Sequence, residues 1–104
     1  MAELTEHEFS KHLNSKFKLR VNERDLELDL VEVKAYRPKE HEEEGMERFS
    51  AFFAGPGDAF LPQCLYQLSH EKMGDIDIFL VPISGDQNGY RYEAVFNYYK
   101  EQGQ

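Results

Sequence analysis

The sequence has no tryptophan and a single cysteine, Cys64, among its 104 residues. A lone cysteine excludes an intrachain disulfide and a zinc site built on several thiolates. Cys64 precedes the apolar residues Leu65 and Tyr66, so we expect it to be a small buried residue rather than a nucleophile. Cysteine chemistry therefore gives no indication of function.

Long apolar runs and excess basic charge are also missing. No run approaches the roughly 18 apolar residues of a membrane-spanning helix, and the first residues lack the layout of a signal peptide. Lysine and arginine number 12 against 20 aspartates and glutamates, which gives a formal net charge of −8. Such a balance repels phosphate. We expect a cytoplasmic protein that binds neither nucleic acid nor membranes.

Aromatic residues, by contrast, are plentiful. Eight phenylalanines and six tyrosines can supply much of the apolar burial that a small sheet needs. A chain of this length is expected to form one domain, residues 1–104. Its hydrophobic fraction of 40% and charged fraction of 31% are typical of a folded globular domain.

The last third of the chain carries the clearest structural pattern. Three runs of alternating apolar and polar residues are separated by turn signals at Met73-Gly74 and at residues 85–89. Alternation with a period of two is typical of strands, and the Asn-Gly pair in the second signal is typical of a hairpin. The pattern predicts an antiparallel meander.

The middle run, residues 75–83, is apolar on both faces. A strand that is apolar on both faces is expected near the middle of a barrel or sandwich, covered on both sides. Pro82 should lie at the edge or the end of this strand, because proline has no N–H to donate to the ladder.

A short helix is predicted at the start. Thr5, with Glu8 three residues later, forms the sequence signature of a capping box, and Leu4 and Phe9 are placed for the hydrophobic staple. Phe9 and Leu13 share one face of such a helix and are expected to dock on the sheet.

Two further features lie in the first half. Residues 17–21 alternate as a half-buried strand, and a polar turn follows at 22–25. In the next run the apolar residues alternate up to Leu30 and then change phase to Val31 and Val33. A pattern with a period of two cannot change phase without an extra residue, so a β-bulge is predicted near Leu30 and Val31.

These elements add up to one helix and about six strands without helical crossovers. Short consecutive strands joined by turns form an antiparallel sheet that must curl, close or stack to cover its apolar face. We therefore predict a mainly β fold, a small antiparallel β-barrel or β-sandwich of about six strands with one short N-terminal helix.

No catalytic, metal or cofactor signature emerges from the residue pattern. The acidic run at residues 40–44 lacks the alternating ligands of a calcium loop and is read as a solvated loop. The four histidines show no convergent spacing, and no serine lies in a nucleophile elbow. Ser69 and His70 are adjacent, so they point to opposite faces of a strand.

The chain contains four distinctive blocks, residues 49–57 (FSAFFAGPG), 61–70 (LPQCLYQLSH), 73–83 (MGDIDIFLVPI) and 90–97 (YRYEAVFN). They resemble the signature blocks of a small bacterial family of domains of unknown function, and the resemblance runs over nearly the whole chain. The family's members often neighbour proteins that resemble phage tail-collar and tail-fibre components, which implies a structural or assembly role.

Polar residues inside these blocks are the candidate site. Gln63, His70 and Glu93 either satisfy buried backbone groups or, together with Tyr92, line a cavity for a small ligand. His70 and Glu93 are also the one conceivable acid/base pair for an enzyme.

Tyrosines near the end of the chain offer a different kind of site. Tyr98 and Tyr99 lie just past the inward set of the last strand and could form a contact surface, since tyrosine favours interfaces. Our leading hypothesis is a non-enzymatic interaction or assembly module without cofactor, which binds a protein partner or associates with itself. A small-ligand-binding barrel ranks second, and an enzyme third.

Overall fold

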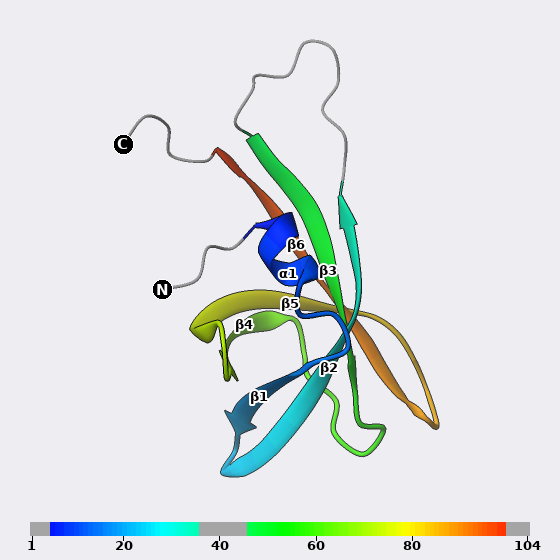
Figure 1. The fold of residues 1–104 in the computed structure, drawn as a ribbon. Helices are drawn as coiled ribbons and strands as arrows, with labels where there is room; N and C mark the ends of the chain where they lie inside the picture. Colours follow the sequence, from blue (N-terminus) through cyan, green and yellow to red (C-terminus); the bar gives the residue numbers. More distant parts are fainter. Residues whose placement is uncertain (1–4, 36–45, 100–104) are drawn as a thin grey trace.

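A short helix precedes six strands in the computed structural model, which describes residues 5–35 and 46–99 (Figure 1). The mainly β class and the short N-terminal helix are thereby confirmed. The elements are α1 (Glu6–Ser10), β1 (Lys16–Val21), β2 (Arg24–Ala35), β3 (Met46–Gly55), β4 (Cys64–His70), β5 (Gly74–Asp86) and β6 (Gly89–Tyr99).

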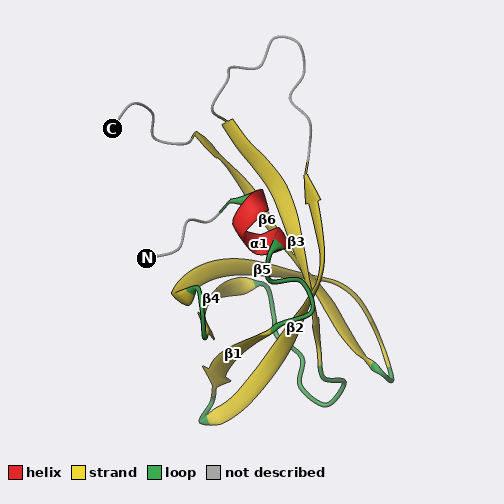
Figure 2. Ribbon diagram, viewed as in Figure 1, coloured by secondary structure: helices red, strands yellow, loops and turns green. Residues whose placement is uncertain are grey.

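The strands close into an antiparallel barrel in the order β1-β2-β3-β6-β5-β4 (Figure 2). Of the two predicted architectures, the barrel is the correct one. The chain forms two meanders of three strands, β1 to β3 and β4 to β6. Their contacts with each other, β3 with β6 and β1 with β4, close the barrel.

The pairing around this barrel is uneven. β5 pairs with β4 over residues 74–80 and with β6 over residues 81–86. β6 pairs with β3 along its whole length, but its last pair with β5 joins Glu93 to Val81. Beyond that pair the two strands diverge (Figure 1). Between β1 and β4 the structure shows one pair, Lys18 with Ser69.

The helix forms where the capping pattern predicted it. The Oγ1 atom of Thr5 accepts a hydrogen bond of 3.1 Å from the N–H of Glu8, and Phe9 is completely buried. The expected docking of Leu13 is wrong, because the helix ends at Ser10 and Leu13 follows in a turn with 40% of its surface exposed. The partner of the predicted staple, Leu4, lies outside the described residues.

The predicted turn and bulge are both present in the first hairpin. Asn22 and Glu23 join β1 to β2 with positive φ angles of 52° and 65°, as a tight two-residue hairpin requires. Leu30 pairs with Phe53 of β3, whereas Glu32 pairs with the residue before it. Val31 is therefore the extra residue of a bulge.

The barrel interior is filled by aromatic and aliphatic side chains from every strand and from α1. Phe9 of the helix contacts rings of three strands, at centroid distances of 6.2 Å to Phe17, 5.6 Å to Phe49 and 5.3 Å to Phe96. The largest fully buried members are Tyr92, Phe9, Phe17, Phe49, Phe53, Leu28, Leu30, Leu61, Leu68, Ile78 and Leu80.

Two expectations about burial are corrected by the structure, and the edge position predicted for Pro82 is confirmed. Phe79 and Ile83 are exposed on the outer face of β5, because no described element packs outside the barrel there. Cys64 is also exposed, and it is the first residue of β4. Pro82 lies inside β5 rather than at its end, but at an edge position, because this part of β5 pairs with β6 and no longer with β4. A bulge between Pro82 and Ser84 follows, and proline is tolerated at such positions because it has no N–H to donate.

Candidate functional site

His70 ends β4 and organises the turn that leads into β5. Its Nδ1 atom accepts hydrogen bonds from the backbone N–H groups of Lys72, at 3.0 Å, and Met73, at 3.1 Å. Gly74 follows with a φ angle of +78°, which closes the three-residue turn at little steric cost. Because Nδ1 is an acceptor in both bonds, the ring proton must lie on Nε2.

The other ring nitrogen of His70 reaches the segment after α1. Nε2 lies 2.9 Å from the Oγ of Ser15, and with the proton on Nε2 the histidine is the donor. The hydroxyl of Ser15 in turn donates to the backbone carbonyl oxygen of His12. This resembles a serine–histidine pair, but an Nε2 that carries a proton cannot accept one from serine, so Ser15 is not activated as a nucleophile.

Packing keeps His70 neutral. Its ring lies 4.5 Å from the ring of Phe17 and 4.6 Å from that of His12. Burial and, secondly, the charge that His12 can carry lower the pKa of His70 below its ordinary value of 6.5. The interpretation in which His70 satisfies buried backbone groups therefore accounts for its contacts. The sequence pattern does not indicate its partner Ser15, because Ser15 is 55 positions away and carries no motif.

Tyr92 and Glu93 point to opposite sides of the barrel wall. Tyr92 is fully buried, its hydroxyl oxygen accepts the N–H of Leu61 at 3.0 Å, and burial raises the pKa of its phenol. Glu93 lies on the outer side, where the Ser50 hydroxyl donates to its Oε2 at 2.7 Å. Gln63 is exposed in the loop before β4.

The four candidate residues do not share a pocket in this structure. His70 lines a small groove beside Ser15, whereas the hydrogen bonds of Tyr92 and Glu93 go to other partners. His70 contacts core rings and Glu93 lies on the outer face, so no contact joins them as an acid/base pair. Each of the three bonded residues has a structural partner instead.

Tyr98 and Tyr99 belong to the end of β6. Their backbones pair with Glu47 and Met46 of β3. Their side chains lie outside the described part of the chain, so the predicted contact surface there stays a prediction.

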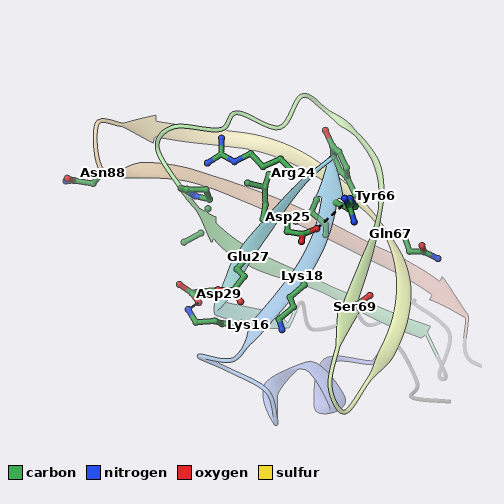
Figure 3. Close-up of a pocket in the computed structure, with 16 residues that line it drawn as sticks. Lys16, Lys18, Arg24, Asp25, Glu27, Asp29, Tyr66, Gln67, Ser69 and Asn88 are labelled. Atoms are coloured by element: carbon green, nitrogen blue, oxygen red, sulfur yellow. Dashed lines mark hydrogen bonds and ion pairs between the residues drawn. The ribbon is translucent and has the colours of Figure 1, made fainter. Parts of the chain in front are cut away.

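A groove of about 1150 Å³ runs along the seam between β1 and β4 (Figure 3). The groove lies where β1 and β4 are joined by the single described pair of Lys18 with Ser69. Its walls are polar, and cross-strand ion pairs join Lys16 to Asp29 at 2.8 Å and Arg20 to Asp25 at 3.8 Å. The hydrogen bond and charge of Asp29 raise the pKa of Lys16. Lys18, between these pairs, has no ion-pair partner among the described residues.

The outer wall of β4, β5 and β6 carries a different surface. Leu65 is 59% exposed, Phe79 48% and Val95 62%. Leu65 and Phe79 are direct cross-strand partners. The last pair of β5 with β6 joins Val81 to Glu93, and the strands diverge beyond it. Phe79 lies two residues before Val81 and Val95 lies two residues after Glu93, so they flank the point of divergence. We call these three residues the outer apolar patch.

The described part of the chain holds neither a metal-ligand cluster nor a membrane-spanning helix. Within residues 5–35 and 46–99, no three histidine, cysteine, aspartate or glutamate side chains gather where they could hold a metal ion. No helix in this part of the chain has the length and apolar character needed to cross a membrane.

Comparison with known proteins gave one match. A family model described as Domain of unknown function (DUF6916) matches residues 4–96. Neither the curated proteins nor the solved structures gave a match.

Proposed function

We propose that this chain, which belongs to the DUF6916 family of domains of unknown function, acts as a non-enzymatic interaction or assembly module. The observation that carries the proposal is the outer apolar patch. Exposed Leu65, Phe79 and Val95 stabilise the isolated barrel little, because their apolar surface stays in water. Exposed apolar side chains that lie side by side on paired strands, as Leu65 and Phe79 do, are typical of protein-interaction sites.

The candidate chemical groups support the same proposal. Both ring nitrogens of His70 form hydrogen bonds, Nδ1 with the β4–β5 turn and Nε2 with Ser15. The hydroxyl of Tyr92 accepts the backbone N–H of Leu61. Groups that are occupied in this way have no free proton-transfer position. The resemblance to a family that neighbours tail-collar-like and tail-fibre-like proteins favours an accessory of such an assembly. The cytoplasmic location and the absence of nucleic-acid and membrane partners stay predictions.

The test compares wild type with a variant that removes the patch. Leu65→Thr, Phe79→Thr and Val95→Thr keep β-propensity at exposed strand positions. The control replaces Lys18 and Glu27, two exposed residues of the opposite hairpin, by threonine. Mass is measured by light scattering after size exclusion over a wide concentration range, and stoichiometric partners are sought by co-purification from the source cell.

We expect wild type and the control variant to form an oligomer or a stoichiometric complex that the patch variant cannot form. A wild-type protein that stays monomeric at high concentration and co-purifies with no partner would refute the proposal. So would an equal loss of association in the control variant.

A second candidate function is small-ligand binding, and the groove along the β1–β4 seam favours it. The groove is lined by Lys18, which has no ion-pair partner in residues 5–35 and 46–99, and by its cross-strand neighbour Glu27. Such a pair of charges suits a small zwitterionic molecule. A panel of amino acids and their derivatives should then raise the melting temperature of wild type and not that of Lys18→Ala. No shift with any compound at millimolar concentration would remove this alternative.

A further inference from the structure

Where β5 and β6 diverge, each strand has one edge that pairs with no other described strand. Residues 74–80 of β5 pair with β4 on one side, and residues 94–99 of β6 pair with β3 on one side. On the sides that face each other, neither segment pairs with a strand in the described part of the chain. We call the region where these two segments diverge the β5–β6 split (Figure 1). Unpaired strand edges are templates for pairing with another chain.

On the inner side of the barrel, α1 and the turn after it contact residues near the split. Phe9 of α1 contacts Phe96 of β6 at 5.3 Å, and His12, after the helix, contacts His70 at the end of β4 at 4.6 Å. A partner strand in the split would lie in the barrel wall, outside these contacts.

The outer side of the split is apolar. Phe79 flanks it on β5 and Val95 flanks it on β6, both pointing outward and about half exposed or more. Leu65 continues this surface beyond Phe79. In a strand, alternate side chains point to one face. A strand in the split would therefore bring its outward side chains against Phe79 and Val95.

Carboxylates border this apolar surface. Asp77 is the next outward residue from Phe79, and Glu93 is the next outward residue from Val95. Asp77 has no hydrogen bond or ion pair with a residue that the structure places, and Glu93 accepts a neutral hydroxyl, that of Ser50. The whole chain carries a formal charge of −8. A partner segment whose charge is complementary to these carboxylates carries lysine or arginine beside its apolar side chains.

We infer that the β5–β6 split receives an extended segment of a protein partner by strand addition. The outward face of that segment carries apolar side chains flanked by lysine or arginine. Main-chain hydrogen bonds to the free edges give affinity, and the outward side chains give specificity. The inference rests on the proposed interaction function and names the site and the partner chemistry for it. Repulsion between like charges disfavours a second copy of this acidic chain as the partner.

The test uses a defined probe, the peptide acetyl-Lys-Thr-Val-Thr-Val-Thr-Lys-amide, which presents lysine and valine on one face of a strand. Binding to ¹⁵N-labelled protein is followed by NMR. We expect the amide signals of residues 74–80 and 94–97 to shift and their hydrogen exchange to slow. Raising NaCl from about 50 mM to about 500 mM should weaken binding several-fold, because the charge contacts are exposed.

Changes in the peptide test strand addition without altering the protein. N-methylation of alternate backbone amides keeps every side chain and removes edge hydrogen bonds, so affinity should fall by about tenfold or more. A scrambled peptide of the same composition and a version with glutamate for lysine should bind more weakly than the probe. In the protein, Phe79→Thr and Asp77→Asn should each weaken peptide binding, whereas Lys18→Thr at the β1–β4 seam should not.

Several outcomes overturn the inference. They are no binding at millimolar peptide, shifts that map to the β1–β4 seam, and equal affinity for the probe and its N-methylated or scrambled versions. If the probe fails while the patch variant still loses a native complex, strand addition is wrong and the interaction function stands. If the patch variant also loses nothing, both proposals fail.

Discussion

Replacing His70 with alanine tests the role that the structure gives to this residue. The imidazole joins the β4–β5 turn to the linker between α1 and β1, across the seam where β1 and β4 share a single described pair. Its removal should destabilise the whole barrel, because this seam has few other contacts to hold it closed. A binding or catalytic role alone would predict an unchanged stability.

The size of the effect follows from the bonds that are lost. The N–H of Met73 is buried, and leaving it without an acceptor costs about 1–3 kcal/mol. The N–H of Lys72 belongs to an exposed residue and can turn to water, and the bond to Ser15 contributes about 1 kcal/mol. With lost packing against Phe17, we expect His70→Ala to reduce the free energy of unfolding by about 3–4 kcal/mol.

The assay is urea denaturation of wild type, His70→Ala, His70→Asn and Ser15→Ala. Asparagine places an oxygen near the position of Nδ1, so His70→Asn should recover part of the loss by accepting a turn N–H. Ser15→Ala should cost about 1 kcal/mol, and combining it with His70→Ala should cost less than the sum. A loss below about 1 kcal/mol for His70→Ala, or no difference between alanine and asparagine, would refute the argument.

The same residue predicts a pH dependence with a defined sign. Its folded-state pKa lies below the ordinary value of 6.5, so as the pH falls the unfolded chain takes up this proton first. The stability due to neutral His70 is therefore fully present above about pH 6.5 and declines as the pH falls toward the folded-state pKa. The stability difference between wild type and His70→Asn should shrink from about pH 7 to about pH 5. A growing difference would contradict the assigned tautomer.

Three further predictions use the same reasoning. Tyr92→Phe leaves the N–H of Leu61 without its acceptor and should lower the free energy of unfolding by about 1–2 kcal/mol in urea, with an unchanged fold by NMR. Gly74→Ala should cost about 1 kcal/mol, because its φ of +78° is strained for alanine although no atom lies within 4 Å of the new Cβ; a neutral result would contradict this. Exposed Cys64 should react with a thiol reagent in the native state, and protection until unfolding would show that it is covered.

Local patterns in the sequence predicted local structure well. The change of phase at Leu30 and Val31 identified a bulge, because the alternation of side chains is a property of the strand itself. Thr5 identified the helix start for a similar reason, since a cap acts within three residues. The hairpin signal at residues 85–89 also corresponds to the β5–β6 turn.

Properties that depend on distant residues were not predictable in the same way. Ser15 and His70 meet because β1 and β4 are neighbours in the closed barrel, and nothing near either residue encodes that pairing. Cys64 was expected to be buried from its apolar neighbours, but it lies exposed at the first position of β4, and its neighbours in sequence do not show where the strand begins. Phe79 was expected to be covered but is exposed, because a sequence shows that a residue is apolar without showing what packs against it.

The β1–β4 seam and the β5–β6 split differ in role: we expect the seam to contribute to stability and the split to interaction. The β1–β4 seam is held from within, where His70 and Ser15 bond across it, so changes there should be read out in the free energy of unfolding. At the β5–β6 split, Phe9 of α1 contacts Phe96 on the inner side, and the outer residues Phe79 and Val95 remain largely in water. Apolar groups that stay in water contribute little to folding, so threonine at these positions should leave stability within about 0.5 kcal/mol of wild type while abolishing association. A variant that lost both together would show that the outer apolar patch is part of the fold.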